Sequence, residues 1–315
     1  MKRGVYLALG IAFFLAFILI LNPQKIFETI MLTNLKIFAL ALVLDFIVLL
    51  VLTIKFKAVL SRVYGKELSF SNAFRSHMVS NMFGLVSPAK SGEVVKAYIL
   101  KKRFEIDYSK GLVTVIIERV SDLIGICFLI ILIGSLIISE SVVGGFIFST
   151  IILLLVIVFM VLSLTSNKLI HILLRFPFLS NKLERGKIED FQKDLKENLK
   201  PTKFASPLLI GILAQLFSAL RIYIIFISLG KNVAFFESLL IFFVTLVIGI
   251  LTLIPGGLGS MEISGSILYS KFLGLDLTTS VVAIFLLRLS TYIVDLPLGL
   301  ISGYSLNFWK KKLKY

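Results

Sequence analysis

Long apolar stretches, each near the length of a membrane-spanning helix, dominate the hydropathy pattern of this chain. A helix needs about 20 mostly apolar residues to cross ~30 Å of hydrocarbon. Seven stretches approach that length: Gly4–Leu21, Ile37–Ile54, Gly111–Ile138, Val142–Thr165, Phe204–Leu229, Ser238–Ile254 and Thr279–Phe308. This pattern predicts an all-α integral membrane protein in which residues 1–315 form a single transmembrane domain. The first stretch follows Lys2 and Arg3 and lacks a small-residue cleavage pattern, so we expect an uncleaved signal anchor.

Two segments depart from the apolar pattern. Residues 166–203 form a charged insert in which Ile188, Phe191, Leu195 and Leu199 recur at helical spacing. That spacing predicts an amphipathic helix, which lies either at the membrane interface or in solvent as a connector. The second segment, Leu68–Ser87, carries polar side chains at Arg75, Ser76, His77, Ser80 and Asn81. It is typical of a helix that enters the membrane and turns back, because such a segment is tolerated where protein or a wet cavity surrounds it.

The chain also contains an internal repeat. Pro88-Ala89-Lys90-Ser91-Gly92-Glu93 is followed by Arg119, 26 residues after the glutamate. Pro255-Gly256-Gly257-Leu258-Gly259-Ser260-Met261-Glu262 is followed by Arg288 at the same spacing. The two glutamates and the two arginines therefore share an offset of 169 residues, as do Lys102 and Lys271. We interpret this as a duplication of the order span, broken hairpin, span.

The repeat and the basic residues together predict the topology. We assume about six full spans and two re-entrant hairpins in inverted repeats (37–138 and 204–308). The presumed cytoplasmic pieces are then residues 1–3, 55–66, 90–110, 166–204 and 309–315, and they hold 25 of the 33 basic residues. The presumed outer pieces then hold only four: Lys25, Lys36, Lys231 and Lys271. This arrangement satisfies the positive-inside rule, and inverted repeats with broken helices are a recurrent transporter design. We therefore expect both termini and the insert to be cytoplasmic, at the plasma membrane; a bundle of 7–8 full spans is the alternative.

Composition narrows the class of protein. The chain is 58% apolar and 16% charged, outside the range of ordinary soluble domains. Its net charge of +15 in so apolar a chain indicates membrane orientation rather than nucleic-acid binding. The only cysteine, Cys127, cannot form an intrachain disulfide, and His77 and His171 without a second cysteine make no zinc cluster. We expect no metal and no cofactor. The sequence contains no phosphate loop for ATP and no catalytic set; Glu105-Ile106-Asp107 is a weak match to a glycosyltransferase acidic motif.

Ionisable residues inside the apolar runs are the main candidates for function. Nine fall in or beside these runs: Asp45, Glu93, Glu118, Arg119, Asp122, Arg221, Glu262, Arg288 and Asp295. Unpaired in lipid they would cost roughly 25 kcal/mol, whereas a span of Leu, Ile and Phe recovers only about 6–12 kcal/mol. Most must therefore face one another or water, either as buried ion pairs that fix helix packing or as the lining of a ligand cavity.

The spacing of these residues predicts specific neighbours. We expect each hairpin glutamate to pair with the arginine that follows it 26 residues later. Glu118 and Asp122 share a helix face, and Arg288 and Asp295, seven residues apart, also lie on one face.

The hairpin tips are rich in proline and glycine. Proline ends a helix, and glycine permits the tight backbone that follows. Backbone amides beside Gly92, Gly256, Gly257 and Gly259, together with the base Lys90, would form an anion site. The alternative is a tight loop with no ligand.

At these tips the sequence resembles the flippase-like family, also called the lysylphosphatidylglycerol synthase transmembrane region. The resemblance covers residues 5–308 and is carried by Asn81, Pro88, Gly92, Glu93, Glu118-Arg119, Asp122, Pro255-Gly256-Gly257-Leu258-Gly259, Glu262, Arg288 and Tyr292. It implies a helical lipid-translocating module with two re-entrant segments and cavities for an anionic or modified phospholipid. It also implies, for some archaeal members, a link to polyprenyl-phosphate sugar pathways.

Two departures limit what the resemblance implies. Full-length lysylphosphatidylglycerol synthases continue into an aminoacyl-transferase domain, so we expect no aminoacyl transfer here. The first tip has Ala89-Lys90-Ser91 where the family often has Gly-Arg-hydrophobic, and Lys90 keeps the charge without the guanidinium fork.

Three functional hypotheses follow from the sequence. The leading one is a flippase or scramblase that moves an anionic or polyprenyl-phosphate-linked lipid between leaflets, with membrane lipids as partners and no nucleic acid. The alternatives are a membrane glycosyltransferase of the polyprenyl-phosphate sugar pathway, and a non-catalytic partner of separate lipid-modifying enzymes.

Overall fold

The protein is an all-α membrane protein, as the sequence predicts. The computed structural model describes residues 23–137, 150–152, 154–155, 157–159, 161–162, 164–166 and 187–308. Within these residues the only extended pairing is one isolated bridge between Pro88 and Pro255. The predicted anchor Gly4–Leu21 lies outside the described residues, and the predicted span Val142–Thr165 is described only in part.

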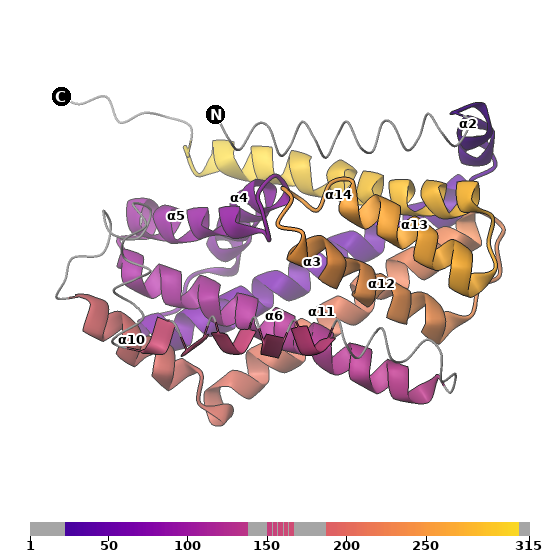
Figure 1. Cartoon of the computed structure of the whole chain (residues 1–315). Helices are drawn as coiled ribbons and strands as arrows, with labels where there is room; N and C mark the ends of the chain where they lie inside the picture. Colours follow the sequence, from indigo (N-terminus) through magenta and orange to yellow (C-terminus); the bar gives the residue numbers. More distant parts are fainter. Residues whose placement is uncertain are drawn as a thin grey trace.

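Four long helices form the frame of the molecule (Figure 1): α3 (Leu35–Tyr64), α6 (Tyr108–Leu136), α11 (Pro201–Ser228) and α14 (Leu277–Ser305). Each has 28 to 30 residues, which makes it about 42–45 Å long and sufficient to cross a bilayer. Of the described helices, α3, α11 and α14 are long and apolar enough to be candidate spans. The fourth, α6, is equally long but carries Glu118, Arg119 and Asp122 in its middle.

Shorter helices connect these four into two halves with the same order of elements. In the first half, α3 is followed by α4 (Phe70–Leu85), the 3-10 turn η1 (Ser91–Val94), α5 (Val95–Phe104) and then α6. In the second half, α11 is followed by α12 (Phe235–Leu251), α13 (Ser260–Leu273) and then α14. Each half therefore places a broken hairpin between two long helices, in the order that the sequence repeat predicts.

The two hairpins meet at their tips in the middle of the molecule. Pro88 and Pro255 form the antiparallel bridge, and the Gly256 amide donates to the Ser87 carbonyl at 3.2 Å. From this junction α5 and α13 run toward opposite ends of the molecule (Figure 1). The arrangement of the two hairpins is thus head to head.

Helix ends are fixed by local sequence. Asn34 caps α3, accepting from the amides of Lys36 and Ile37, and Gly65 ends the same helix in a left-handed conformation. Asp276 caps α14 by accepting from the Thr279 amide at 2.8 Å. These caps satisfy amides and carbonyls that a helix end leaves free.

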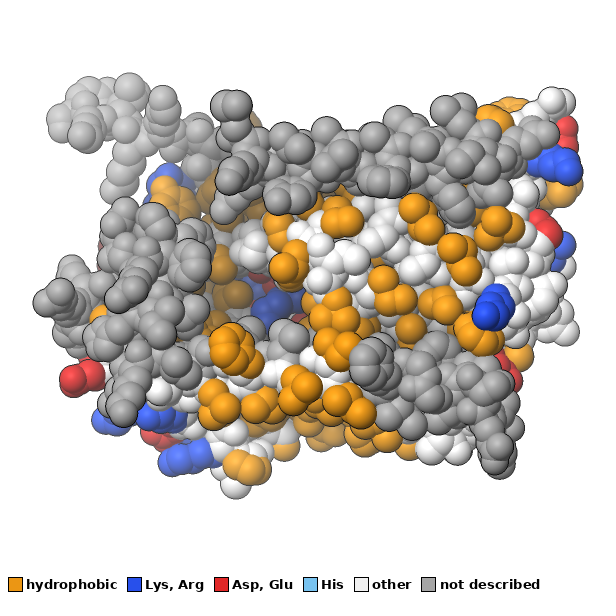
Figure 2. All heavy atoms as spheres, viewed as in Figure 1, with side chains coloured by type: hydrophobic (Ala, Val, Ile, Leu, Met, Phe, Trp, Pro, Cys, Tyr) orange, Lys and Arg blue, Asp and Glu red, His pale blue; other side chains and the backbone are white. Residues whose placement is uncertain are grey.

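The outer face of the bundle is apolar. Large hydrophobic side chains remain exposed along the long helices, among them Leu40, Val43, Ile131, Leu209, Leu213, Leu300 and Ile301. Figure 2 shows such side chains spread over the visible face. Exposed apolar surface on this scale is typical of a protein solvated by lipid.

A short helix, α2 (Pro23–Met31), precedes α3. A helix also forms within the charged insert: α10 (Lys187–Asn198), directly before α11. The residues Ile188, Phe191 and Leu195 of α10 are buried against Val59 of α3 and several apolar residues of α6. The amphipathic face is therefore covered by protein.

The described basic side chains outside the interior separate between the two ends of the bundle. One end holds Lys57, Arg62, Lys66, Lys101, Lys102, Arg103, Lys110, Lys193, Lys196, Lys200 and Lys203, and the other holds Lys25, Lys36, Lys231 and Lys271. Three lysines that the charge count had assigned to the cytoplasmic pieces lie elsewhere. Lys90 is at a hairpin tip, and Lys55 and Lys96 are buried in the interior, because each has a carboxylate partner there.

Candidate functional site

Glycine permits one close backbone approach within the first hairpin and one between the two hairpin tips. A Cβ added to Gly92 would overlap the Phe83 carbonyl oxygen, and one added to Gly256 would overlap the Leu85 carbonyl oxygen. Gly256 also has a φ of +63°, a conformation that residues with a side chain rarely adopt. Gly257 and Gly259 also have a positive φ. Of the four glycines of the predicted site, Gly256 therefore permits the contact between the tips, Gly92 permits the close return of η1 onto α4, and Gly257 and Gly259 serve the backbone turn.

The first predicted ion pair is present. Arg119 on α6 donates to Glu93, which lies in η1 directly after the first tip. Arg119 also approaches Asp122 at 3.8 Å. The Glu93 side chain is buried, whereas 26% of the Arg119 side chain is exposed, so the arginine faces a space that water reaches.

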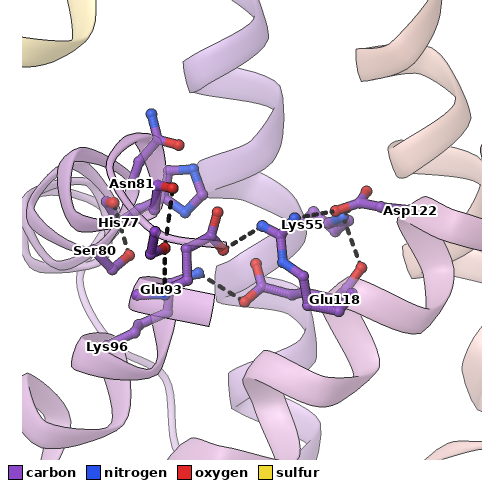
Figure 3. A network of polar contacts seen from close by, with 12 residues as sticks. Lys55, His77, Ser80, Asn81, Glu93, Lys96, Glu118 and Asp122 are labelled. Carbon is purple, nitrogen blue, oxygen red and sulfur yellow. Dashed lines mark hydrogen bonds and ion pairs between the residues drawn. The ribbon is translucent and has the colours of Figure 1, made fainter. Parts of the chain in front are cut away.

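Two lysines complete this cluster, and the sequence analysis missed both. Lys96 on α5 binds Glu118 at 2.8 Å, and Lys55 on α3 binds Asp122. Lys55 also lies 3.4 Å from the Glu118 carbonyl oxygen. Figure 3 shows these contacts crossing between α3, α5 and α6. The sequence held one signal: Lys96 lies three residues after Glu93 and therefore on the same helical face.

This cluster is electrically balanced. The three basic side chains Lys55, Lys96 and Arg119 contact the three acidic side chains Glu93, Glu118 and Asp122. A buried charge is tolerated when a partner of opposite sign and hydrogen bonds replace its hydration. The cluster therefore joins α3, α5, α6 and η1 without a net charge inside the membrane.

His77 lies beside this cluster. It is buried on α4, and no residue that the structure describes forms a hydrogen bond with either ring nitrogen. The ring stacks against Phe56, with centroids 6.3 Å apart. In Figure 3 the ring lies close to Glu93 and Asn81.

The second predicted ion pair is also present, and it holds the second tip. Arg288 on α14 donates from Nε to Glu262 at 2.8 Å and from a terminal nitrogen to the Gly256 carbonyl at 2.7 Å. The other oxygen of Glu262 accepts from the Gly259 amide at 2.7 Å. One arginine and one glutamate thus fix both sides of this turn.

Asp295 does not join Arg288, although the two share a helix. Arg288 is engaged by Glu262 and the tip, while Asp295 accepts a hydrogen bond from the Asn81 amide on α4 at 2.7 Å. Nearby, Arg221 on α11 pairs with Asp45 on α3. The seven-residue spacing placed Asp295 on the correct face but could not identify Asn81, which is 214 residues away in the chain.

Lys90 differs from every other basic residue at the centre. Its side chain is exposed, and no described residue forms an ion pair with it. Its φ is +57°, at the position that the 169-residue offset aligns with Gly259 in the second tip. Figure 2 shows a hollow near the middle of the visible face, with basic and acidic side chains at its floor.

An apolar groove lies on the outer face near Asp45 and Asp295. It measures about 450 Å³ and runs between α3 and α14, lined by Leu42, Val43, Phe46, Ile293, Val294, Pro297 and Leu298. Asp45 and Asp295 lie on the same helical turns as these lining residues, but their side chains are buried on the inner side of the helices. Among the described residues, no group of three or more metal-ligating side chains occurs.

Known proteins resemble this chain over most of its length. Residues 7–299 match the family described as the lysylphosphatidylglycerol synthase TM region. A UPF0104 membrane protein of Methanothermobacter thermautotrophicus is 26% identical over 286 residues, covering 86% of this chain and 84% of the relative. A UPF0104 membrane protein of Methanocaldococcus jannaschii is 24% identical and covers 96% and 94%. A third, from Pyrococcus horikoshii, is 22% identical and covers 95% and 96%.

Proposed function

This chain belongs to the family of lysylphosphatidylglycerol synthase TM regions, and we propose that it moves lipids with an anionic headgroup between the two leaflets of its membrane. The observation that carries the proposal is Lys90, an exposed cation with no described partner at the junction of the two tips. Every other basic side chain in the central clusters contacts a carboxylate. Lys90 is thus the cation that remains to bind a phosphate.

The surroundings of Lys90 suit a headgroup. Arg119, one side of which is open to water, adds a second positive charge beside the first tip. Ammonium and guanidinium groups both bind phosphate through charge-assisted hydrogen bonds. The headgroup would occupy this polar centre, and the balanced pairs around it would keep the passage free of excess charge.

The lipid tails require a different surface. The groove between α3 and α14 is apolar and lies on the lipid-facing side. Its lining residues share helical turns with Asp45 and Asp295, which face inward. We infer that an acyl chain lies in this groove while the headgroup passes through the polar centre. Because the hairpins run to opposite ends from a shared junction, the headgroup could approach from either leaflet (Figure 1).

The orientation is part of the proposal. We place the more basic end of the bundle, with the C-terminus of α14 and the start of α11, on the cytoplasmic side of the plasma membrane.

The test uses purified protein in vesicles that contain phosphatidylglycerol labelled on its headgroup, with a membrane-impermeant quencher added outside. Lys90→Gln removes the charge, and since a hydrogen bond to a charged group contributes about 1.5–3 kcal/mol, the initial rate should fall about tenfold or more. Lys271→Gln is the matched control, because Lys271 is exposed at the end of α13 far from the tips. Equal rates for Lys90→Gln and the unaltered protein would argue against the assignment.

A further inference from the structure

The buried carboxyl groups are not all equivalent. The structure describes six of them, and five contact a basic side chain: Glu93, Glu118, Asp122, Glu262 and Asp45. The sixth, Asp295, has no such contact with any described residue. It is 4% exposed, so water does not replace the missing partner.

The contacts of Asp295 suit a neutral acid better than a carboxylate. One of its oxygens accepts from the neutral amide of Asn81 at 2.7 Å, and the other has no hydrogen-bond partner within the described part of the chain. An ionised carboxylate that is buried requires several donors or a cation, whereas a protonated one requires far less. Asp295 is therefore built to gain and lose a proton within the membrane interior.

The cations that could balance Asp295 come from two neighbouring elements. Arg221 projects from α11, but Asp45 on α3 already contacts it, which leaves one guanidinium for two carboxyl groups. Lys90, in the first tip, is the other cation whose charge acts on Asp295. It forms no ion pair with Asp295, so it favours the ionised form only through its charge at a distance.

The remaining charged groups on the helices around α14 either have other partners or are exposed. Glu262 on α13 is bound to Arg288, and His77 on α4 faces Glu93 and the first cluster (Figure 3). On α2, Lys25 and Glu28 are both exposed. None of these groups supplies a counter-charge to Asp295.

We propose that Asp295 is a proton-binding site and that it takes up a proton when Lys90 binds a lipid phosphate. A phosphate at Lys90 cancels the positive charge that favours the ionised form of Asp295, so the carboxylate binds a proton. By reciprocity, protonation of Asp295 removes a negative charge that would repel the phosphate, and so favours phosphate binding at Lys90. Each anionic headgroup that binds and leaves is therefore accompanied by the uptake and release of one proton at Asp295. This linkage depends on the proposed function in one respect, namely that the ligand at Lys90 is a lipid phosphate.

The proton site can be observed directly by infrared difference spectroscopy of the full chain in nanodiscs, between acid and alkaline pH. We expect a protonated-carboxyl band that Asp295→Asn removes. Asp107→Asn is the matched control, because Asp107 is exposed and its side chain caps no amide. A spectrum without any band that depends on Asp295 overturns the proposal. Asp295→Asn imitates the protonated form and should fold; if it does not, Asp295→Glu keeps the proton site and should shift the band instead.

The linkage is tested by adding short-chain phosphatidylglycerol to purified protein in weakly buffered detergent with a pH indicator. We expect uptake of about one proton for each bound lipid, and none with Asp295→Asn or with uncharged diacylglycerol. In vesicles, lipid movement should slow by up to about tenfold for each pH unit as Asp295 ionises, and should be independent of pH in Asp295→Asn.

The two proposals fail in different ways. Proton uptake on lipid binding without any lipid movement would refute the proposed function and support the proton site. Lipid movement with the same pH dependence in the unaltered protein and in Asp295→Asn, without proton uptake, would refute the proton site and support the proposed function.

Discussion

Removing the charge of Lys96 tests how strongly the first cluster stabilises the fold. Lys96 is fully buried, Glu118 is 2% exposed, and their nitrogen and oxygen atoms are 2.8 Å apart. In Lys96→Met the aliphatic stem still packs, but the Glu118 carboxylate loses its ion-pair partner, and Lys55 contacts only the backbone carbonyl of that residue. Because breaking one partner of a buried pair leaves an uncompensated charge, we expect the free energy of unfolding to fall by about 3–5 kcal/mol.

The same lysine has a second interaction that must be separated from the first. Its ammonium lies 4.5 Å from the centre of the Phe56 ring, and a desolvated contact of this kind contributes about 1–2 kcal/mol. The double variant Lys96→Met with Glu118→Leu loses this contact but strands no charge. We therefore expect the double variant to lose only about 1–2 kcal/mol, or less.

The assay is reversible unfolding in mixed micelles, with helix content followed by circular dichroism for the two single variants and the double variant. The coupling energy from the double-mutant cycle should be about 3 kcal/mol or more. Additive single effects would show that the pair is not coupled, and would remove the argument that these charges are structural partners. A double variant that is stable but does not move lipid would show instead that the pair also serves transport.

Three further predictions follow from other parts of the structure. Gly256→Ala should lower the thermal midpoint more than Gly274→Ala, because both glycines have a positive φ but only at Gly256 would the new Cβ overlap a backbone carbonyl; equal effects would argue against close contact of the tips. Asp276→Ala should cost about 1 kcal/mol at neutral pH. Although partial burial raises the pKa of Asp276, hydrogen bonds from Thr279 outweigh it and hold that pKa below its usual value, so the difference from the unaltered protein should vanish as the pH falls below about 4 in thermal unfolding. Single cysteines at Lys271 and Lys101 should react with an impermeant thiol reagent from opposite faces of the membrane, and labelling of both from one face would contradict the inverted arrangement.

The sequence predicted the fold class and two ion pairs because membrane burial leaves little freedom. A charged residue within an apolar run must find a partner, and the 26-residue spacing that occurs twice identified Arg119 for Glu93 and Arg288 for Glu262. The order of long and short helices followed from the same repeat. These features depend on local pattern or on two similar copies, both of which are readable in one chain.

The remaining contacts depend on three-dimensional packing that no local pattern encodes. Lys55 and Lys96 adjoin apolar runs, and lysines in such places usually extend to the membrane surface, so they were counted with the cytoplasmic bases. Here each turns inward to a carboxylate on another helix. Asn81 is similarly a polar residue among several on α4, and only the packing of α4 on α14 selects it as the donor to Asp295.

The bridge between the two tips has a consequence for biosynthesis. Pro255 follows Pro88 by 167 residues, which a ribosome needs about 10–30 seconds to add. Throughout that interval the nascent first hairpin has no Gly256 amide for its Ser87 carbonyl and no second tip to close against. A chain that stalls before the second hairpin therefore has an incomplete polar centre for as long as it remains at the translocon.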